Sequence, residues 1–384
     1  MNLSKPLSSL LAVGAASAGL APVPGLAQEP AFTVVAQHLE APRGLRFGPD
    51  GGLYVAEAGR GGSNSTVGQC PQVPGPVVGP YKGGSSARIS RINVHNSTIS
   101  TVASGFPSTQ DAMGDLIGVA DVAFLDGTLY ALVAGGGCSH GNPTSPSGIA
   151  KVDSHTGKWT LLADIGAWLK THPANFESAD DFEPDGTLYS LVAQYGVLYT
   201  VEPNHGQIIA VTPKGRITQV IDISASQGHI VPTSFAIREG VFYVGNLSLF
   251  PIDPQWARIL TISHPHPDDL VDVPPGLSPA AGYRVTSSKA GFTTVVAVDF
   301  GPDGLLYALE LSDGPPGGFP TPTLGKVVRV LHSGAIEDVV TGLNVPTGMT
   351  FGPDGRLYVS DFGAVPAPGF GLGRILSFDI PPGW

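Results

Sequence analysis

The chain has 384 residues, of which 52 are glycine and 36 proline, and it carries a formal net charge of −11. An excess of acidic residues leaves no basic surface to neutralise phosphates, which argues against binding to nucleic acid or to anionic membranes. The glycine and proline content suits a turn-rich, all-β protein. Solubility outside the cell is a sufficient explanation for the charge as a whole.

Residues 1–27 have the outline of a secretory signal peptide. Lys5 precedes the apolar stretch LLAVGAASAGLA, and the small residues Gly25 and Ala27 come just before Gln28. The alternative is a disordered tail. No apolar run reaches the roughly 18 residues that a membrane span needs. We therefore expect a secreted or periplasmic protein without a membrane span, whose mature part, 28–384, is a single domain.

A tetrapeptide of the form Gly-x-(Leu/Phe)-Tyr recurs along the chain. It occurs seven times, and six of the copies are widely spaced. The seventh copy, GTLY at 186–189, starts only ten residues before another copy and is interpreted as a neighbouring strand of the same unit. Most copies follow a turn such as FGPDG or FLDG and open a second apolar run, which is the pattern of a β-hairpin. Repeated turn-then-strand signals predict an array of similar units. The six widely spaced copies start at Gly51, Gly127, Gly196, Gly240, Gly304 and Gly355.

Two more strand-like runs follow most hairpins, so each unit has four strands. Six such units predict an all-β, six-bladed β-propeller with four-stranded antiparallel blades. The last unit has only three strands, so FTVVAQHL at 32–39 is predicted to complete it and close the ring, which removes an exposed edge. Only IGAWLKTH, near 165–172, has a helical pattern. The blades are expected near 42–104, 117–164, 173–223, 232–286, 291–341 and 346–380, the last together with 31–39.

A polar residue recurs where the second strand of each hairpin ends. The Asp-Gly turns lie on one face of the ring, so these strand ends lie on the opposite face, here called the loop face. Carboxylate and amide oxygens around a channel could hold Ca²⁺ or another divalent cation. The alternative is that each side chain caps backbone N–H groups of its own blade. The five residues are Glu57, Glu202, Asn246, Glu310 and Asp361, while the sixth copy has Val133.

Histidines occur in loops on the same face. A histidine can act as a base, as a metal ligand or as a hydrogen-bonding group near neutral pH, although most loop histidines are only solvated or hydrogen-bonded. The sequence contains neither HExxH nor a phosphate-binding glycine loop that would point to another site. The candidate ligand-binding residues are therefore His140, Asn204, His205 and His229.

The two cysteines, Cys70 and Cys138, fall in long loops of consecutive units on the loop face. In an exported protein, paired cysteines are more often bridged than free, and two cysteines alone seldom bind a metal. The alternative is a pair of free thiols. We predict a disulfide, which would stabilise the fold by about 2–4 kcal/mol.

Several longer segments resemble the ScyD/ScyE family of exported propeller proteins. They are ADDFEPDGTLYSLVAQYGVLYTVEPNHG, HIVPTSFAI, FYVGNLSLFP and GLNVPTGMTFGPDGRLYVSDFG, and the first unit with its long Gly-rich loop also fits. EPNHG, VPTS and YVGNL are the specific part, whereas FGPDG-x-LYV also occurs in NHL repeats and gluconolactonases. The resemblance covers nearly all of the chain after residue 27. It implies a propeller fold and export, and it transfers no catalytic residue.

Three functions are compatible with the sequence. The first is binding of a small molecule, a glycan or a partner protein on the loop face, which Gly-rich loops of varied length favour. The second is a metal-dependent hydrolase or lactonase of gluconolactonase type, in which the five strand-end residues hold a cation that polarises a carbonyl. The third is a quinoprotein dehydrogenase, for which a basic cluster to seat the quinone is missing. A propeller fold alone cannot choose among them, and we expect a monomer.

Overall fold

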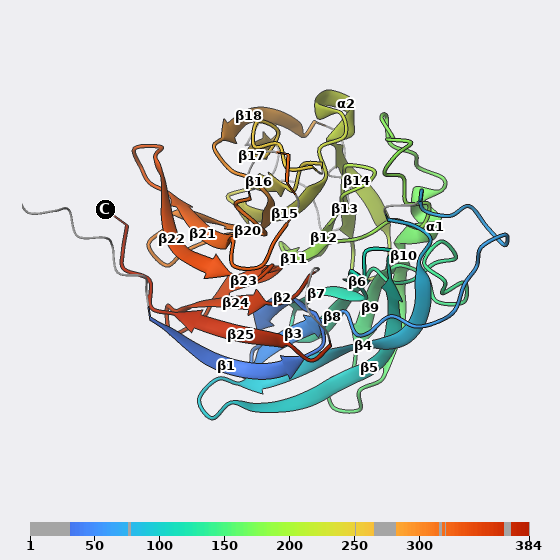
Figure 1. Ribbon diagram of the computed structural model, residues 1–384, viewed down its shortest axis with the longest axis horizontal. Coiled ribbons are helices and arrows are strands. Elements are labelled where there is room, and N and C mark those ends of the chain that lie inside the picture. Colours follow the sequence, from blue (N-terminus) through green and yellow to red (C-terminus); the bar gives the residue numbers. More distant parts are fainter. Residues whose placement is uncertain are drawn as a thin grey trace, which may run out of the picture.

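The computed structural model describes residues 31–75, 78–249, 251–264, 282–314, 317–318, 320–364 and 370–383. Its strands form six antiparallel sheets around a central axis, as the sequence predicts (Figure 1). The predicted signal peptide, residues 1–27, lies outside the described residues. Within the described ranges, no helix is long and apolar enough to cross a membrane.

The first three blades lie between Pro42 and Asp222. Blade 1 contains β2 (Pro42–Phe47), β3 (Leu53–Glu57), β4 (Lys82–Asn93), β5 (Thr98–Gln110) and the short β6 (Leu116–Ile117), which adds a fifth strand to the expected four. Blade 2 contains β7 (Val119–Leu125), β8 (Thr128–Val133), β9 (Gly148–Val152) and β10 (Trp159–Asp164). Blade 3 contains β11 (Ser190–Gln194), β12 (Val197–Glu202), β13 (Gln207–Val211) and β14 (Ile217–Asp222).

The last three blades follow in the same order. Blade 4 contains β15 (Pro232–Arg238), β16 (Val241–Asn246), β17 (Arg258–Ser263) and β18 (Arg284–Ala290), and blade 5 contains β19 (Val295–Phe300), β20 (Leu306–Glu310), β21 (Gly325–Val330) and β22 (Ile336–Leu343). Blade 6 contains β23 (Gly348–Phe351), β24 (Leu357–Asp361), β25 (Gly373–Phe378) and β1 (Phe32–Leu39). In the described ranges, two short helices connect blades, α1 (Ile165–Leu169), where a helix is expected, and α2 (Ser224–Gln227).

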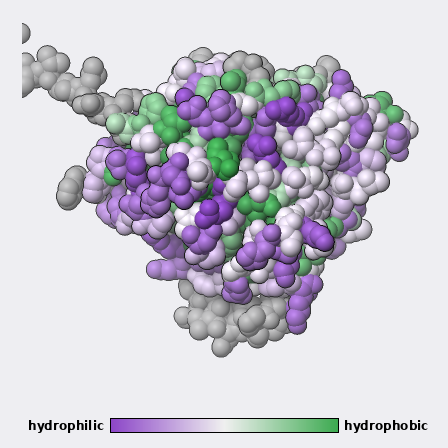
Figure 2. All heavy atoms as spheres, turned by 90° about the horizontal axis from the view of Figure 1, so that it is seen from below, coloured by the Kyte–Doolittle hydropathy of each residue, from purple (hydrophilic) through white to green (hydrophobic). Residues whose placement is uncertain are grey.

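The N-terminal strand closes the ring, as predicted. β1 runs antiparallel to β25, with Phe32 opposite Phe378 and Leu39 opposite Gly373. Its inward side chains, among them Val35 and Leu39, are buried against blade 1. Closure therefore rests on burial of one side of β1 as well as on the backbone hydrogen bonds between β1 and β25. The outer surface on the side where β1 and β5 lie has hydrophilic and hydrophobic residues interspersed (Figure 2).

The repeated FGPDG-x-LY motif builds the turn face. In blade 1, Asp50 accepts hydrogen bonds from Gly52 N at 3.1 Å and from the Tyr54 hydroxyl at 3.3 Å. Gly51 has φ of 73°, a conformation that residues with a side chain rarely adopt. The motif thus fixes its own turn by local contacts, and the same aspartate-to-tyrosine bond recurs at Asp303–Tyr307 and Asp354–Tyr358.

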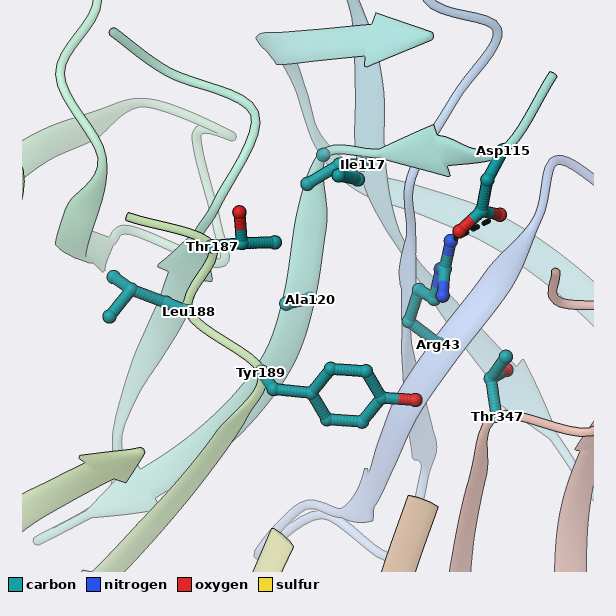
Figure 3. Close-up of a pocket in the computed structure, with 9 residues that line it drawn as sticks. Arg43, Asp115, Ile117, Ala120, Thr187, Leu188, Tyr189 and Thr347 are labelled. Carbon is teal, nitrogen blue, oxygen red and sulfur yellow. Dashed lines mark hydrogen bonds and ion pairs between the residues drawn. The ribbon is translucent and has the colours of Figure 1, made fainter. Parts of the chain in front are cut away.

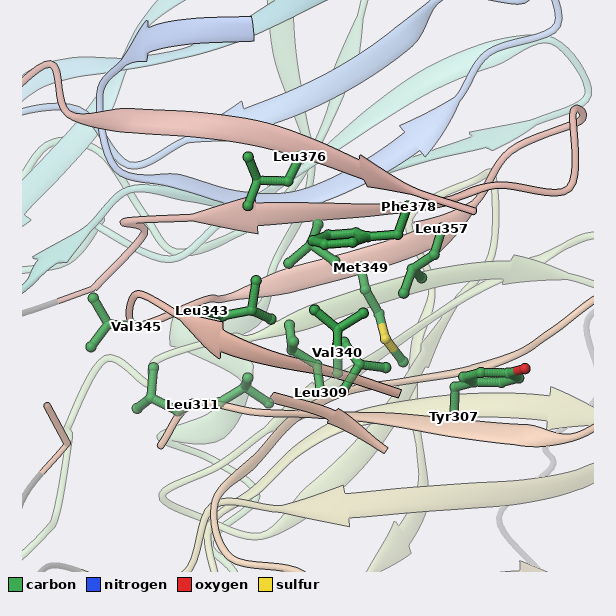
Figure 4. Packing of buried hydrophobic residues seen from close by; sticks show 14 of the residues in the cluster. Tyr307, Leu309, Leu311, Val340, Leu343, Val345, Met349, Leu357, Leu376 and Phe378 are labelled. Atoms are coloured by element: carbon green, nitrogen blue, oxygen red, sulfur yellow. The ribbon is translucent and has the colours of Figure 1, made fainter. Parts of the chain in front are cut away.

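The same motif joins neighbouring blades. The Phe that opens the turn packs edge-on against the Tyr of the adjoining blade, as Phe47 does against Tyr358 with ring centroids 5.0 Å apart. Further apolar side chains fill the space between neighbouring blades. The cluster between blades 5 and 6, which includes Tyr307, is an example (Figure 4). The other three Phe–Tyr pairs are Phe124–Tyr54, Phe300–Tyr243 and Phe351–Tyr307.

Candidate ligand-binding site on the loop face

The recurring polar residues at the ends of the second strands bind their own blades. Glu57 accepts a hydrogen bond from Glu40 N at 2.6 Å, and Glu202 accepts one from Thr187 N at 2.8 Å. In both blades the donor lies in the segment that leads into the first strand. Each carboxylate therefore ties the entry of its blade to the end of the second strand.

The other three polar strand-end residues make equivalent bonds. Asn246 Nδ2 donates to Ile230 O at 2.8 Å, Glu310 accepts from Thr293 N at 3.1 Å, and Asp361 accepts from Asn344 N at 2.5 Å. Burial raises the pKa values of Glu310 and Asp361, although these hydrogen bonds oppose the shift. All five side chains are buried. Their contacts favour the capping alternative.

A divalent cation does not fit this donor set. The oxygens of a calcium site converge on one point at about 2.3–2.6 Å, whereas each of the five side chains is already engaged within its own blade. Two carboxylates are also paired with arginines, since Arg88 binds Glu57 and Arg374 binds Asp361, each at 2.7 Å. Among the described residues, no group of three or more His, Cys, Asp and Glu side chains is placed to hold a metal ion.

The predicted disulfide is present. Cys70 and Cys138 are bonded, with their Cα atoms 6.4 Å apart and 68 positions apart in the sequence. The bond joins the long loop of blade 1 to the loop that follows β8. Next to it, the Thr66 hydroxyl donates to Cys138 O. The two loops therefore form one cross-linked wall of the loop face.

His140 lies in a buried network beside this disulfide. Its Nε2 is 2.9 Å from Glu183 Oε2, its Nδ1 is 2.6 Å from Gly136 O, and Tyr81 donates to the other Glu183 oxygen at 2.9 Å. Burial lowers the pKa of His140, but the Glu183 carboxylate outweighs burial and leaves this pKa raised. Burial also raises the pKa of Glu183, against the opposing effect of His140. The network joins loops of blades 1 and 2 to the segment before blade 3.

The other three candidate residues gather on that same segment. Asn204 donates to Asp181 O at 3.0 Å, and His229 Nε2 lies 2.8 Å from Asp181 Oδ2. His205 Nε2 lies 3.2 Å from Glu183 O. The structure thus places all four predicted ligand-binding residues around Asp181 and Glu183. Sequence reasoning missed these two acids, although both stand in the ADDFEPDG segment that carries the family resemblance.

A pocket of about 90 Å³ lies on the loop face, where the innermost strands of blades 1, 2, 3 and 6 begin around the axis. Figure 3 shows the Tyr189 hydroxyl directed toward Arg43 and Thr347. Ala120 of β7 lies nearer to the backbone end of the Tyr189 side chain. The polar residues thus come from segments of blades 1, 3 and 6 that are far apart in sequence. Its complete lining is Arg43, Asp115, Ile117, Gly118, Ala120, Thr187, Leu188, Tyr189 and Thr347.

Charges in this axial pocket are compensated. Arg43 donates to Asp115 Oδ1 at 3.0 Å and also to Leu116 O. Burial by itself would lower the pKa of Arg43. The attraction of the Asp115 carboxylate is larger than this effect, so the pKa of Arg43 is raised overall. Burial raises the pKa of Tyr189 to about 12, so its hydroxyl is protonated at neutral pH. Burial and the charge of Asp115 also raise the pKa of nearby Asp111 to about 7.

The sequence did not single out the axial residues. Arg43 stands in an ordinary strand run, and Tyr189 belongs to the repeated GTLY, whose other tyrosines build hairpins and blade contacts. The copy at 186–189 instead leads into β11, which pairs with β12. Since β11 begins on the loop face, Tyr189 lies on that face, in the lining of the axial pocket. Its position ten residues before another copy was the only signal that it differs.

Comparison of the sequence with protein-family models and with curated proteins finds no match. Among solved structures, the calcium-binding protein regucalcin from Agrobacterium tumefaciens has a TM-score of 0.56 and 15% identity, over 93% of this chain and 96% of its own. A gluconolactonase from Xanthomonas campestris has a TM-score of 0.50 and 12% identity, over 91% and 89%. A luciferin-regenerating enzyme has a TM-score of 0.54 and 9% identity, over 92% and 97%. At these identities, the similarity shows the six-bladed fold alone.

Proposed function

We propose that the protein is an exported propeller of ScyD/ScyE type that binds a small molecule at the axial pocket of the loop face. The observation that carries the proposal is the pocket itself, which combines apolar walls with a few polar groups. Ligand sites in proteins have this composition, and they favour places where several elements meet. Of the polar side chains that line the pocket, Thr187 donates to Glu183 and Thr347 donates to Pro42 O. Arg43, which keeps its bond to Asp115, and Tyr189 are the polar groups that would meet a ligand.

The chemistry of the pocket favours a neutral ligand. The charge of Arg43 is balanced by Asp115, and Asp111 lies close to both. An anionic group would therefore meet one cation and up to two carboxylates, whereas a carbonyl or hydroxyl group could share donors without repulsion. The protonated Tyr189 hydroxyl can both donate and accept.

The size of the pocket sets how much of a ligand it holds. Its volume of about 90 Å³ is well below the roughly 300–1,000 Å³ of sites that enclose a whole ligand. The pocket therefore takes one end of the molecule, and the rest lies against the surrounding loops. Ile117, Ala120 and Leu188 suit an apolar end.

A metal-dependent lactonase is the second candidate, and the fold of the gluconolactonase and regucalcin neighbours supports it. The five strand-end residues that would supply the metal ligands do not fit this role, because each is hydrogen-bonded within its own blade. Hydrolysis of gluconolactone by the purified protein, with and without added Ca²⁺, tests this alternative directly.

Ligand binding can be tested by saturation-transfer NMR with a library of neutral, anionic and cationic fragments. We expect neutral fragments to bind and Tyr189→Phe to weaken them about 10-fold, because it removes the hydroxyl without changing the ring. Tyr195→Phe is the matched control, since Tyr195 is 63% exposed in a turn on the opposite face. Fragments that bind both variants as well as the unmodified protein would contradict the proposal.

Export is supported by the Cys70–Cys138 disulfide and by the composition of residues 1–27. Expression in the native type of cell, followed by N-terminal sequencing of the protein from the periplasm or medium, should give Gln28 as the first residue. Recovery of an uncleaved chain from the cytoplasm would contradict export and leave the binding proposal intact.

A further inference from the structure

The three candidate histidines differ in how their rings are satisfied. Both ring nitrogens of His140 have partners, and His229 is paired with Asp181. His205 is 2% exposed, yet its Nδ1 is buried without a hydrogen-bond partner. Buried polar atoms are normally satisfied, so this nitrogen requires an explanation.

The other nitrogen of His205 defines the state of the ring. Nε2 lies 3.2 Å from the Glu183 backbone carbonyl, which can only accept a hydrogen bond. Nε2 therefore donates this bond, and in the ring tautomer that carries its hydrogen on Nε2 the Nδ1 atom has a lone pair. The carboxylate of Glu177 lies 3.6 Å from this atom, which is within ion-pair range but too long for a hydrogen bond.

We propose that His205 Nδ1 and the Glu177 carboxylate bind a divalent transition-metal ion such as Zn²⁺. With metal bonds of about 2.0–2.2 Å and a tetrahedral angle, the two ligand atoms should be roughly 3.3–3.6 Å apart. The observed separation is 3.6 Å. Imidazole is a preferred ligand for zinc, copper and nickel, in contrast to the all-oxygen sites of calcium.

The surroundings of His205 resemble those of a metal ligand. Metal-binding histidines usually donate their second N–H to a carboxylate or backbone carbonyl, which fixes the ring, and Glu183 O accepts this bond here. Phe182 packs against the ring at a centroid distance of 5.3 Å. Glu177 also stands in the acidic segment ESADDFEPD, 177–185, and a local excess of negative charge favours a cation.

The site would be open and of moderate affinity. The described residues place no third His, Cys, Asp or Glu side chain with this pair as a ready ligand, so water must complete the coordination. Glu177 is partly exposed, which leaves a path for the ion. The capping carboxylate of Glu202 accepts a hydrogen bond from His205 N at 2.5 Å and so helps to hold the residue in place. Neither His205 nor Glu177 lines the axial pocket, so the inference does not depend on the proposed small-molecule binding.

Isothermal titration of the full mature protein with Zn²⁺ tests the inference. We expect one ion per chain, and at least 10-fold weaker binding for both His205→Gln and Glu177→Gln. The matched controls are His155→Gln and Glu239→Gln, exposed residues in turns away from the site, and both should bind as the unmodified protein does. Glu177→Gln alters a partly exposed residue, so it remains informative if His205→Gln does not fold.

Nitrogen NMR of the histidine rings gives a second readout. Addition of Zn²⁺ should shift the Nδ1 resonance of His205, while its Nε2 stays protonated. Failure of the unmodified protein to bind Zn²⁺ would overturn the proposal, and so would binding that His205→Gln and Glu177→Gln leave unchanged, because the ion would then occupy another site.

Discussion

The two faces of this propeller are built in different ways. On the turn face, the FGPDG-x-LY motif makes nearly all its contacts within a hairpin or to the adjoining blade, as at Asp354 and Tyr358. On the loop face, contacts join residues that are far apart in sequence, such as Tyr81 and Glu183, which are 102 positions apart. A repeated local motif can therefore build a scaffold, whereas the candidate sites require segments unique to single blades.

The capping residues lie between these two cases, because they recur in sequence but act on the loop face. Replacing Asp361 by Ala should cost about 3–5 kcal/mol of the free energy of unfolding, since it leaves Asn344 N and Arg374 without their buried partner. Replacing the exposed turn residue Asp354 by Ala should cost only about 1 kcal/mol. Urea denaturation of the two variants measures the difference. Equal losses would show that the caps contribute no more than the turns.

The Cys70–Cys138 disulfide cross-links the loop face and has no counterpart on the turn face. The double variant Cys70→Ser/Cys138→Ser should lose about 2–4 kcal/mol, because the bond restricts the unfolded chain. Chemical denaturation of this variant and of the unmodified protein, both without reductant, measures the loss. The unmodified protein with reductant serves as the control and should match the variant. If all three denaturation curves coincide, the cross-link does not stabilise the loop face.

Between the faces, Asp121 on β7 links blades 2 and 3 by accepting a hydrogen bond from Leu191 N at 2.8 Å. Burial raises its pKa from 3.8 to about 6. Between these values the folded state retains a proton that the unfolded state has lost, so stability falls as pH rises from about 4 to 6. The two pKa units correspond to about 3 kcal/mol at most.

The variant Asp121→Asn should lack this pH dependence. Asparagine has one acceptor oxygen for the two backbone donors of Asp121, Val122 N and Leu191 N, so the stability of the variant is lower by a constant amount at every pH. The measurement is the slope of unfolding free energy between pH 4 and 6, relative to the unmodified protein. Asp126→Asn, in an exposed turn of the same blade, is the control and should keep the slope. A slope that Asp121→Asn leaves unchanged would assign the effect to other groups.

The smallest expected effects test whether the turn face is truly repetitive. Replacing the Phe of each Phe–Tyr pair by Leu should cost about 1 kcal/mol, because the edge-on aromatic contact is lost while most apolar area is kept. The losses at the four positions should be similar, as the pairs have similar geometry. A single dominant position in thermal denaturation would show that the repeat is not equivalent in energy. The four positions are Phe47, Phe124, Phe300 and Phe351.

The sequence by itself determined the architecture, because the hairpin signal is local and recurs in every blade. It also predicted closure by 32–39, since three strands in the last unit leave an edge that another strand must cover. The disulfide could be predicted because Cys70 and Cys138 occupy corresponding loops of consecutive blades. In each case, the information lies in short segments whose partners are set by the repeat.

Only the tertiary structure decided which polar residues are free for chemistry. The identity of Glu57 or Asp361 allows either a cap or a cation ligand, and the choice depends on which backbone groups come within hydrogen-bonding distance. Arg43 and Tyr189 meet only when the ring closes, and the partners of His205 depend on a loop packed over blade 3. Long-range proximity of this kind is not encoded in a local pattern, because each residue looks the same in sequence whatever lies across the channel.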